Sequence, residues 1–573
     1  MELAELIRYS RGEDPAHLLL KNARLVNVLS GEIIKTDVAV ARSRIVGIGA
    51  DYQAREIIDL GGAYLAPGYI DAHVHIESSM SPPSEFARTV VPLGVTTVIT
   101  DPHEIANVLG LDGIRFMFES AKNGPLSMYV VAPSCVPATN METNGATLHW
   151  YDLVSLKSDP WVLGLAEVMN FPGVIYGDDE VLDKLRIFKD DIIDGHAPGV
   201  SGKALQTYIA TGIRSDHEAS GLEEAREKLR AGMNIFIREA TNAHNLKALL
   251  PLVNERNHQR FCFCTDDRQP ADLLDQGSID FMVRTAIQEG IDPIIAIRMA
   301  TWNPAQYFRL YDRGAIIPGG RADMIVFDDL QAPRAKMVFR GGKLVAREGS
   351  MTLPAQELPD RALRHTMNVA WDKVNFEIPA RGHVARVIGH TPNQLVTRHL
   401  QMEVPIVDGL AQADPSRDIL KMAVIERHMY SGNVGKGFIH GIGLQRGALA
   451  SSVAHDHHNI VVVGADDQSM MTAARRVAAM GGGLVTAEND KILAEVPLPL
   501  AGLMSKAPMP VIRDQVAAVI AAARHLGSPL HDPFMGMSFM ALEVIPSLKL
   551  TDMGLVDVDK FQFTSLWVDE ETG

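Results

Sequence analysis

GYIDAHVH, at residues 68–75, is the stretch that decides the fold, because it is a short apolar segment that ends in two ionisable side chains, His73 and His75. Seven more apolar segments follow the same plan, and they end at Asp101, Ser134, Glu167, His196, His217, Glu239 and Asp266. Counted from His75, the gaps are 26, 33, 33, 29, 21, 22 and 27 residues, so each has room for one helix and its return. This spacing predicts an α/β fold, a (β/α)8 barrel of the TIM type over residues 67–309, with an open doubly wound sheet as the alternative.

Helical patterns lie inside several of these gaps. The segments EFARTVVPLG, DGIRFMFESAKNG, EVLDKLRIF and GLEEAREKLRAGM carry apolar residues at helical spacing, and glycine stands near several of their ends.

Two β-rich stretches flank the barrel. Residues 18–49 alternate β-branched residues with turn signals, and residues 314–349 repeat that texture with Gly-rich turns. We expect residues 1–66 and 310–355 to form one small composite β-sandwich. After residue 355, strand-like pieces such as NIVVVGA alternate with helix-like pieces such as IRDQVAAVIAAARHLG, which predicts a third, α/β-type domain over residues 356–573.

Composition limits the classes of function. The 573 residues carry 54 Lys+Arg and 70 Asp+Glu, for a net charge of −16, with no clustered basic run of the kind that nucleic-acid binding requires. We therefore expect no nucleic-acid partner. The first twenty residues do not read as a signal peptide, and no uninterrupted apolar run is long enough to cross a membrane, so we expect a soluble, cytoplasmic protein without a membrane partner. The chain has only three cysteines, too few for a disulfide framework in a protein of this length, which agrees with a reducing compartment.

Ionisable side chains fall where a barrel places its active site, at the carboxyl ends of the strands. His73 and His75 are two apart on a strand, so both imidazoles point to one side. Four later strand ends each supply one more ligand-type side chain, namely Glu167, His196, His217 and Asp266. These six nitrogen and oxygen ligands suit two divalent ions, Mn, Fe or Zn, bridged by a carboxylate and a hydroxide. Taken singly, His196 could instead be a core histidine and Asp266 a helix N-cap.

The ligand order H-x-H, acid, His, His, Asp resembles the amidohydrolase superfamily. The segments GYIDAHVHIESSM (68–80), TDPHEIANVLG (100–110), GLAEVMN (164–170) and SSVAHDHHN (451–459) are similar to those of its metal-dependent adenine deaminase branch, and the resemblance covers the whole chain. Related cyclic amidases bridge their metals with a carbamylated lysine on the fourth strand, whereas this sequence has Glu167 there. A carboxylate already carries the negative charge that lysine gains by carbamylation.

The resemblance implies hydrolysis of adenine to hypoxanthine and ammonia, with Mn or Fe as the first choice of metal and Zn as the alternative. Asp266 is then the catalytic residue, which takes a proton from the attacking water and passes it to the leaving amine. Another hydrolase of this superfamily, acting on an N-acyl or guanidine-like C–N bond, is the alternative, because fold and metals do not fix the substrate.

Several residues are candidates for contacting the purine, and the sequence does not choose among them. The candidates for binding or protonating the ring are Asp267, Asp101, His103, Glu104, Glu77 and Glu218, and for each the alternative is a carboxylate or imidazole that orients a metal ligand. Arg238 and Glu239 are expected to form an ion pair that braces the pocket. A C-terminal cluster, His455, Asp456 and His458, is expected to close the pocket as a lid or to hold a further metal, with a solvated turn as the alternative. We expect a homodimer.

Overall fold

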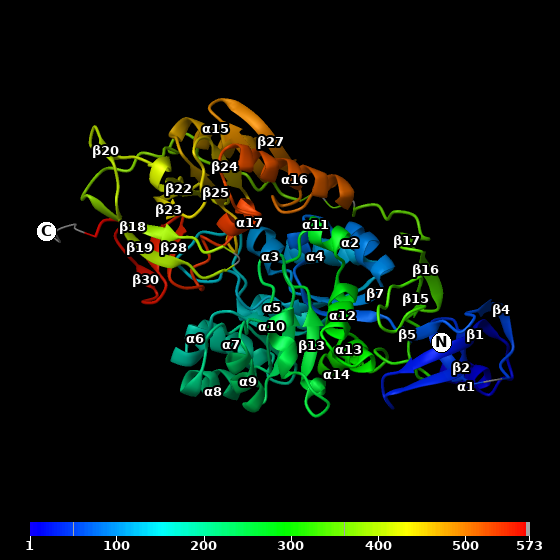
Figure 1. Ribbon diagram of the computed structural model, residues 1–573. Coiled ribbons are helices and arrows are strands. Elements are labelled where there is room, and N and C mark those ends of the chain that lie inside the picture. The colour runs from blue at the N-terminus through cyan, green and yellow to red at the C-terminus, as the bar shows by residue number, and fades with distance from the viewer. Residues whose placement is uncertain (50, 360, 362, 393, 569–573) are drawn as a thin grey trace.

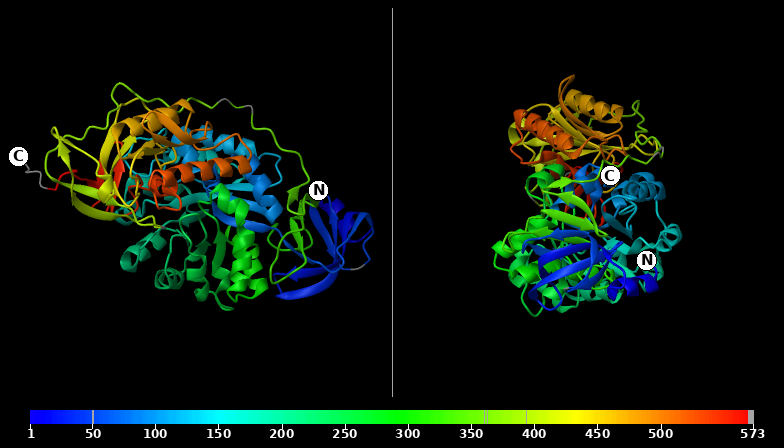
Figure 2. Two further views of the ribbon diagram at one scale, coloured as in Figure 1. Left: turned by 45° about the horizontal axis from the view of Figure 1, so that its top comes forward. Right: turned by 90° about the vertical axis from the view of Figure 1, so that its right-hand side faces the viewer.

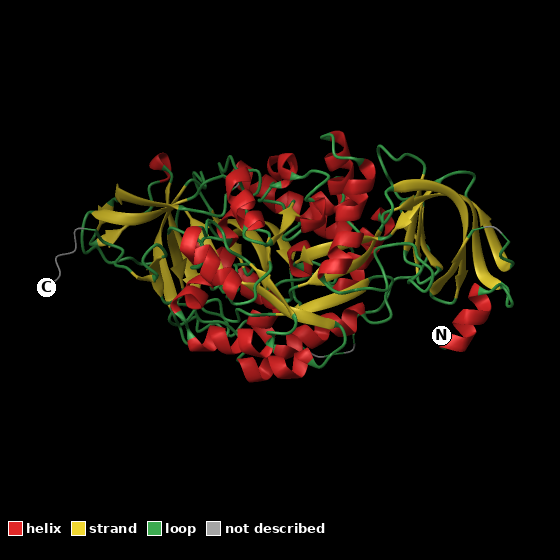
Figure 3. Cartoon of the chain, turned by 90° about the horizontal axis from the view of Figure 1, so that it is seen from below, coloured by secondary structure: helices red, strands yellow, loops and turns green. Residues whose placement is uncertain are grey.

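The computed structural model describes residues 1–49, 51–359, 361, 363–392 and 394–568. The chain forms three parts: a curved sheet near the N-terminus, a helix-rich centre, and a second sheet system near the C-terminus (Figures 1 and 3).

Eight parallel strands form the centre of the molecule. They are β6 (Tyr69–Val74), β7 (Val95–Thr100), β8 (Ser127–Ala132), β9 (Val162–Val168), β10 (Ile192–Gly195), β11 (Ser215–Asp216), β12 (Asn234–Arg238) and β13 (Phe261–Cys264). The hydrogen-bonded orders are β10-β9-β8-β7-β6 and β11-β12-β13. Backbone bonds link these two sets at both seams, from Asp266 N to His73 O (2.9 Å) and from Arg214 N to Ile193 O (3.1 Å). The arrangement is of the predicted TIM-barrel type and not an open doubly wound sheet.

Helices follow the barrel strands at the expected places. They are α2 (Pro83–Val90), α3 (His103–Leu109), α4 (Leu111–Ala121), α5 (Trp150–Lys157), α6 (Phe171–Tyr176), α7 (Asp179–Ile187), α8 (Gly202–Ala210), α9 (Leu222–Arg230), α10 (Leu246–Leu249), α11 (Pro270–Asp275), α12 (Ile279–Gln288), α13 (Pro293–Met299) and α14 (Trp302–Tyr307). The Asp178 side chain caps α7 by accepting a hydrogen bond from Val181 N. Shortly after α9, Gly232 takes a φ of +99°, which turns the chain toward β12.

The flanking β unit draws strands from both sides of the barrel. Its members are β1 (Ala16–Asn27), β2 (Glu32–Ala41), β3 (Arg44–Ile48), β4 (Ala54–Asp59) and β5 (Tyr64–Pro67) with β14 (Met324–Phe327), β15 (Met337–Arg340), β16 (Lys343–Arg347) and β17 (Ser350–Met351). Antiparallel pairing of β14 with β5 joins the two groups into one nine-stranded sheet. The expected sandwich is thus a single sheet that curls around a core containing Leu20, Val38, Met324 and Phe339 (Figure 3).

The C-terminal part is built on an eight-stranded sheet of order β19-β18-β23-β22-β25-β24-β26-β27. These strands are β18 (Val384–Gly389), β19 (Arg398–Glu403), β22 (Ile419–Ile425), β23 (Val434–His440), β24 (Ala448–Ser451), β25 (Ile460–Gly464), β26 (Gly483–Glu488) and β27 (Lys491–Pro497). Alternate residues of β25 face opposite sides of the sheet. Val462 packs with α15 (Asp467–Ala479), whereas Val461 and Val463 belong to the core that contains α16 (Met509–His525).

The C-terminal part packs against the central part (Figure 2), and its residues His455 and Phe539 line one cavity with Glu167 and Asp266 from the carboxyl ends of barrel strands. Hydrogen bonds cross this junction from Ser505 N to Met80 O (2.8 Å) and from Met509 N to Glu85 Oε1 (2.9 Å). A small sheet of β28 (Leu548–Thr551), β29 (Gly554–Asp557) and β30 (Gln562–Phe563) follows α17 (Pro533–Ser538). Across the described residues, no helix is both long and apolar enough to cross a membrane.

Candidate active site

His73 and His75 stand at the carboxyl end of β6 and turn their rings toward the barrel axis. Both side chains are buried, and their Nε2 atoms lie 3.0 Å apart. The His73 ring stacks on that of His217, with 4.3 Å between ring centroids. The backbone carbonyl of Asp101, at the end of the neighbouring strand, lies 3.0 Å from His75 Nδ1, so the opposite edge of that ring is left for the cavity.

Glu167, at the end of β9, lies between two pairs of histidines. Its Oε1 is 3.2 Å from His75 Nε2 and 3.6 Å from His73 Nε2. Its Oε2 is 2.6 Å from His196 Nδ1 and 3.2 Å from His217 Nε2. Burial raises the pKa of this carboxyl group, but His217 and the other imidazoles outweigh burial and hold the pKa well below its usual range. Each oxygen of this carboxylate thus faces a different pair of imidazoles, and the groups His73, His75, Glu167 and Glu167, His196, His217 each lie close enough together to hold one ion.

Asp266 closes the same cluster from the segment after β13. Its backbone has a φ of +55°, and its N–H bonds to His73 O, which ties the segment to β6. Its Oδ1 lies 3.1 Å from His75 Nε2, and its Oδ2 accepts a hydrogen bond from Arg238 Nη1 at 2.8 Å. Burial raises the pKa of Asp266, but the Arg238 guanidinium outweighs it and holds the pKa well below the usual value.

The expected pairing of Arg238 with Glu239 is wrong. Arg238 instead bonds to Glu218 and to Asp266, whereas Glu239 lies 3.0 Å from His244 Nδ1. Arg238 ends β12, and the next residue along an extended chain points away from its neighbour, so the two side chains face different surroundings.

The six candidates for contacting the purine divide into two groups. Four of them line the cavity: His103, Glu104, Glu218 and Asp267. The floor of this cavity is formed by members of the ligand cluster, our name for His73, His75, Glu167, His196, His217 and Asp266. The other two candidates lie behind the cavity: Asp101 Oδ2 is 3.0 Å from His103 Nδ1, and Glu77 Oε1 accepts a hydrogen bond from Ile105 N at 3.2 Å. Asp101 and Glu77 therefore support the cavity wall without belonging to the described lining.

The C-terminal part supplies the roof of this cavity. His455 and Asp456 line it, as do Leu395, Phe539, Leu542 and Ile545. The His455 ring stacks on Phe539, with centroids 4.3 Å apart and an angle of 7° between the planes. The apolar roof residues cannot be recognised in the sequence, because no local pattern marks the loop after α17 as a cover for a barrel in another domain.

The C-terminal histidines converge on Glu104. His455 Nδ1 is 2.5 Å from Glu104 Oε1, and His458 Nε2 contacts Glu104 Oε2. Glu104, His455 and His458 are all buried, and their ligand atoms are close enough to hold one ion. The barrel and the C-terminal part thus meet in a cluster of one carboxylate and two imidazoles.

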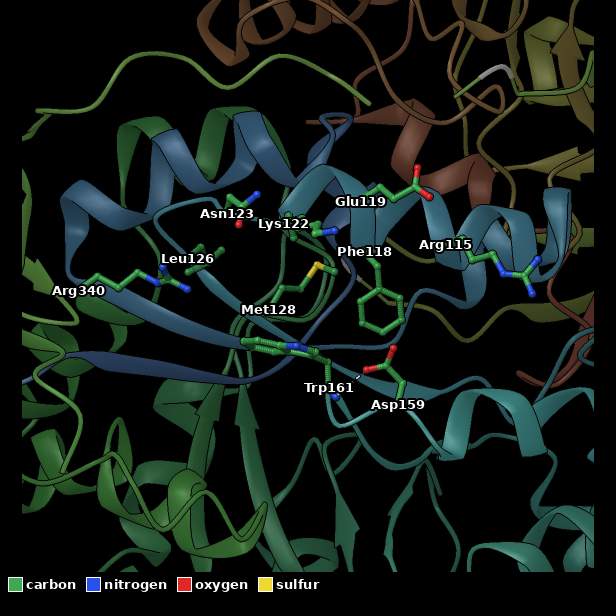
Figure 4. A pocket seen from close by; sticks show the side chains of 11 residues that line it. Arg115, Phe118, Glu119, Lys122, Asn123, Leu126, Met128, Asp159, Trp161 and Arg340 are labelled. Atoms are coloured by element: carbon green, nitrogen blue, oxygen red, sulfur yellow. Dashed lines mark hydrogen bonds between the residues drawn. The ribbon is translucent and has the colours of Figure 1, made fainter. Parts of the chain in front are cut away.

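A separate cavity of about 580 Å³ lies at the amino-terminal ends of β8 and β9 (Figure 4). Trp161, Phe118 and Met128 supply apolar walls, and Arg340 reaches in from the β unit. Its described lining contains no histidine, and it lies at the end of the strands opposite the ligand cluster.

Comparison with known proteins agrees with this geometry. The "Amidohydrolase family" model matches residues 64–345, and the "Adenine deaminase C-terminal domain" model matches residues 394–562. The chain is 50% identical over 565 residues to an adenine deaminase of Desulfatibacillum aliphaticivorans, an alignment that covers 98% of this chain and 99% of the relative. The chain belongs to the adenine deaminase family.

Two other members of the adenine deaminase family show the same extent of similarity. "Adenine deaminase 2" of Carboxydothermus hydrogenoformans is 48% identical, with 98% of each chain covered. The adenine deaminase of Kosmotoga olearia is 46% identical over the full length of both chains. Membership in this family implies divalent-metal binding, and the buried His, Glu and Asp groups described above fit such ions.

Proposed function

We propose that this protein hydrolyses adenine to hypoxanthine and ammonia. Glu167 carries the proposal, because its two oxygens face two separate histidine pairs and Asp266 lies against the same cluster. Such a cluster can hold two ions beside one proton-transferring carboxylate. The near full-length similarity to curated adenine deaminases supports adenine as the substrate.

His73, His75, Glu167, His196, His217 and Asp266 are the proposed ligands of two divalent ions. Imidazole and carboxylate together suit Mn or Fe, with Zn as the alternative. Once bound, the ions lower the pKa of a water molecule so that it is a nucleophile near neutral pH.

Asp266 is the proposed catalytic residue, and it moves the proton. The water oxygen adds to C6 of adenine, and the C6–N bond then breaks, so one water is consumed and one ammonia is released. Asp266 Oδ1 lies on the ligand side, where it can accept a proton from the water and later donate it to the departing amine. Arg238 holds the other oxygen, so the carboxylate keeps one orientation.

The ring nitrogens of the substrate need partners as charge moves into the purine. Glu104, His103, Asp267 and Glu218 are proposed to bind or protonate the ring, because all four line the cavity. His455, Asp456 and His458 are proposed to act as a lid. Phe539, Leu542 and Ile545 add an apolar surface suited to a planar base.

Metal content measured together with adenine turnover tests this function. Purified protein loaded with Mn should bind two ions per chain, release ammonia from adenine and shift the ultraviolet absorbance to that of hypoxanthine. A third bound ion would assign the Glu104, His455 and His458 cluster to metal binding instead of a lid. Turnover of an N-acyl or guanidine-like substrate, with adenine left intact, would contradict the proposed reaction.

We also propose three organisational features. The domains are residues 1–66 with 310–355, residues 67–309, and residues 356–573. The protein is a homodimer, and the exposed side chains of Trp150 and Tyr151 on α5 offer an apolar surface for the contact between subunits. A mass of one chain, measured by light scattering, would contradict the dimer. A cytoplasmic location is supported by the cysteines, since Cys135, Cys262 and Cys264 are all free and buried.

A further inference from the structure

Arg427 is a fully buried arginine in the C-terminal part, two residues after the end of β22 and outside the cavity lining. Its side chain is 0% exposed, and no carboxylate of the described residues lies within ion-pair distance of it. Burying a guanidinium without a carboxylate is costly unless its N–H groups are satisfied by other acceptors. Such a residue indicates that the fold needs the hydrogen bonds that it makes.

Backbone carbonyls from three separate segments accept those hydrogen bonds. Arg427 Nη1 donates to Thr366 O at 2.8 Å, Nη2 donates to Ala501 O at 3.0 Å, and Nε donates to His458 O. The guanidinium also needs Gly502, because a Cβ at that position would lie 3.0 Å from Arg427 Nη2. The planar fork of arginine can serve three fixed acceptors, which a lysine ammonium on a flexible stem does less well.

One of these segments is the loop of residues 455–459, and the surroundings of Arg427 hold that loop at several further points. Arg427 N donates to Asn459 Oδ1 (3.1 Å), and His428 Nε2 lies 2.7 Å from His457 O. Asn459 Nδ2 reaches into the barrel part and donates to Thr143 O at 2.7 Å. The loop is therefore fixed through the backbone carbonyls of His457 and His458 and through the side chain of Asn459. The side chains of His455 and His458 remain free to contact Glu104.

We propose that Arg427 is a positioning residue for the deamination: it holds the loop 455–459 so that His455 and His458 keep Glu104 oriented at the cavity. This rests on the proposed function, since it assigns Glu104 a role toward the substrate. Arg427 itself acts only through the loop, and its contacts join the C-terminal part to a carboxylate that belongs to the barrel.

The test compares Arg427→Lys with a matched control, Arg386→Lys. Arg386 also donates to backbone carbonyls in the C-terminal part, those of Ser565 and Trp567, but it lies on β18 away from the loop. We expect R427K to lower kcat for adenine at least tenfold with a smaller change in KM and with two Mn per chain retained, whereas R386K should keep wild-type kinetics.

A double-mutant cycle separates positioning from general damage. If Arg427 acts through Glu104, R427K should have little further effect on kcat in a Glu104→Gln background. Equal fold losses in both backgrounds, or loss of Mn in R427K, would overturn the proposal. His428→Phe removes another anchor of the loop and should give the same pattern if R427K does not fold.

Hydrogen exchange gives a readout that does not depend on the reaction. Peptides covering residues 452–459 should exchange faster in R427K than in the wild type, while barrel peptides remain unchanged. Unaltered exchange in this loop would overturn the positioning role. Wild-type protein that binds two Mn but does not deaminate adenine would overturn the proposed function instead.

Discussion

At the residue scale, the two oxygens of Asp266 have separate partners. Oδ1 faces His75, and Oδ2 is held by Arg238. A carboxylate fixed in this way can exchange a proton on one side without rotating away. Its left-handed backbone, uncommon for a residue other than glycine, is a strained conformation of the kind that clusters at functional sites.

Asp266→Asn is expected to reduce kcat for adenine by about 10³-fold or more, because an amide cannot carry the proton from water to the leaving amine. The five remaining ligands should still hold metal. Ammonia release and metal content of the same preparation provide the measurement. A variant that retains a tenth of wild-type kcat would contradict the assigned role.

Glu167→Gln is expected to leave fewer than two Mn per chain and to abolish turnover, because a neutral amide is a poor bridge between two cations. Glu239→Gln is the matched control. Glu239 is also an acid at a barrel strand end, but its partner is His244, and it does not belong to the ligand cluster. Equal metal content in both variants would exclude the bridging role.

At the element scale, strand ends were the informative part of the sequence. The convergence of His73, His75, Glu167, His196 and His217 could be predicted, because parallel strands in a barrel bring their carboxyl ends to one face. Their role as metal ligands stays a prediction. The partners of Arg238 could not be predicted, because its sequence neighbour Glu239 points elsewhere along the extended chain. Phe539 and Leu542 were also beyond prediction, since their place over the barrel depends on how two domains pack.

Lys549 on β28 stabilises the same roof from behind. Its side chain is 0% exposed, and its Nζ donates to the carbonyls of Phe539 (2.8 Å) and Leu395 (3.0 Å), two residues whose side chains line the cavity. Burial lowers the pKa of Lys549 to about 7, against a smaller opposing effect of Glu543.

This depressed pKa predicts a pH dependence of stability. Between pH 7 and the unfolded value near 10.5, the unfolded state binds the proton and the folded state does not, so the free energy of unfolding rises with pH. The contribution has a slope of up to about 1.4 kcal/mol per pH unit. Urea unfolding of Lys549→Met at pH 7.5, 8.5 and 9.5 should lack this slope. The exposed Lys560 offers the control, Lys560→Met, which should keep it; identical slopes in all three proteins would refute the prediction.

At the scale of the whole molecule, the active site depends on two parts of the chain that are far apart in sequence. The barrel supplies the proposed ligands, and the C-terminal part supplies the roof. Family membership could be predicted from the motifs in both parts. The contact between Glu104 and His458, separated by more than 350 residues, requires the folded structure.

Metal removal is expected to destabilise the barrel, because metal that binds only the folded state stabilises it. Without cations, Glu167 and Asp266 remain buried among four imidazoles that are arranged for ligation. We expect chelation to lower the apparent thermal midpoint by about 5 °C or more, with recovery on adding Mn. Calorimetry of the metal-loaded and chelated protein checks this, and an unchanged midpoint would argue against structural coupling to the metals.

The nine-stranded sheet has a consequence for biosynthesis. The ribosome makes β1 to β5 first, but β14, which pairs with β5, is translated about 250 residues later. Until then, the β5 edge of a nascent chain is open to other strands, and open edges promote aggregation. The barrel residues lie between these two groups of strands in the sequence, so β14 can pair with β5 only after the whole barrel has been translated. The insertion of the barrel between β5 and β14 therefore sets the interval during which the emerging chain is open to misassembly at this edge.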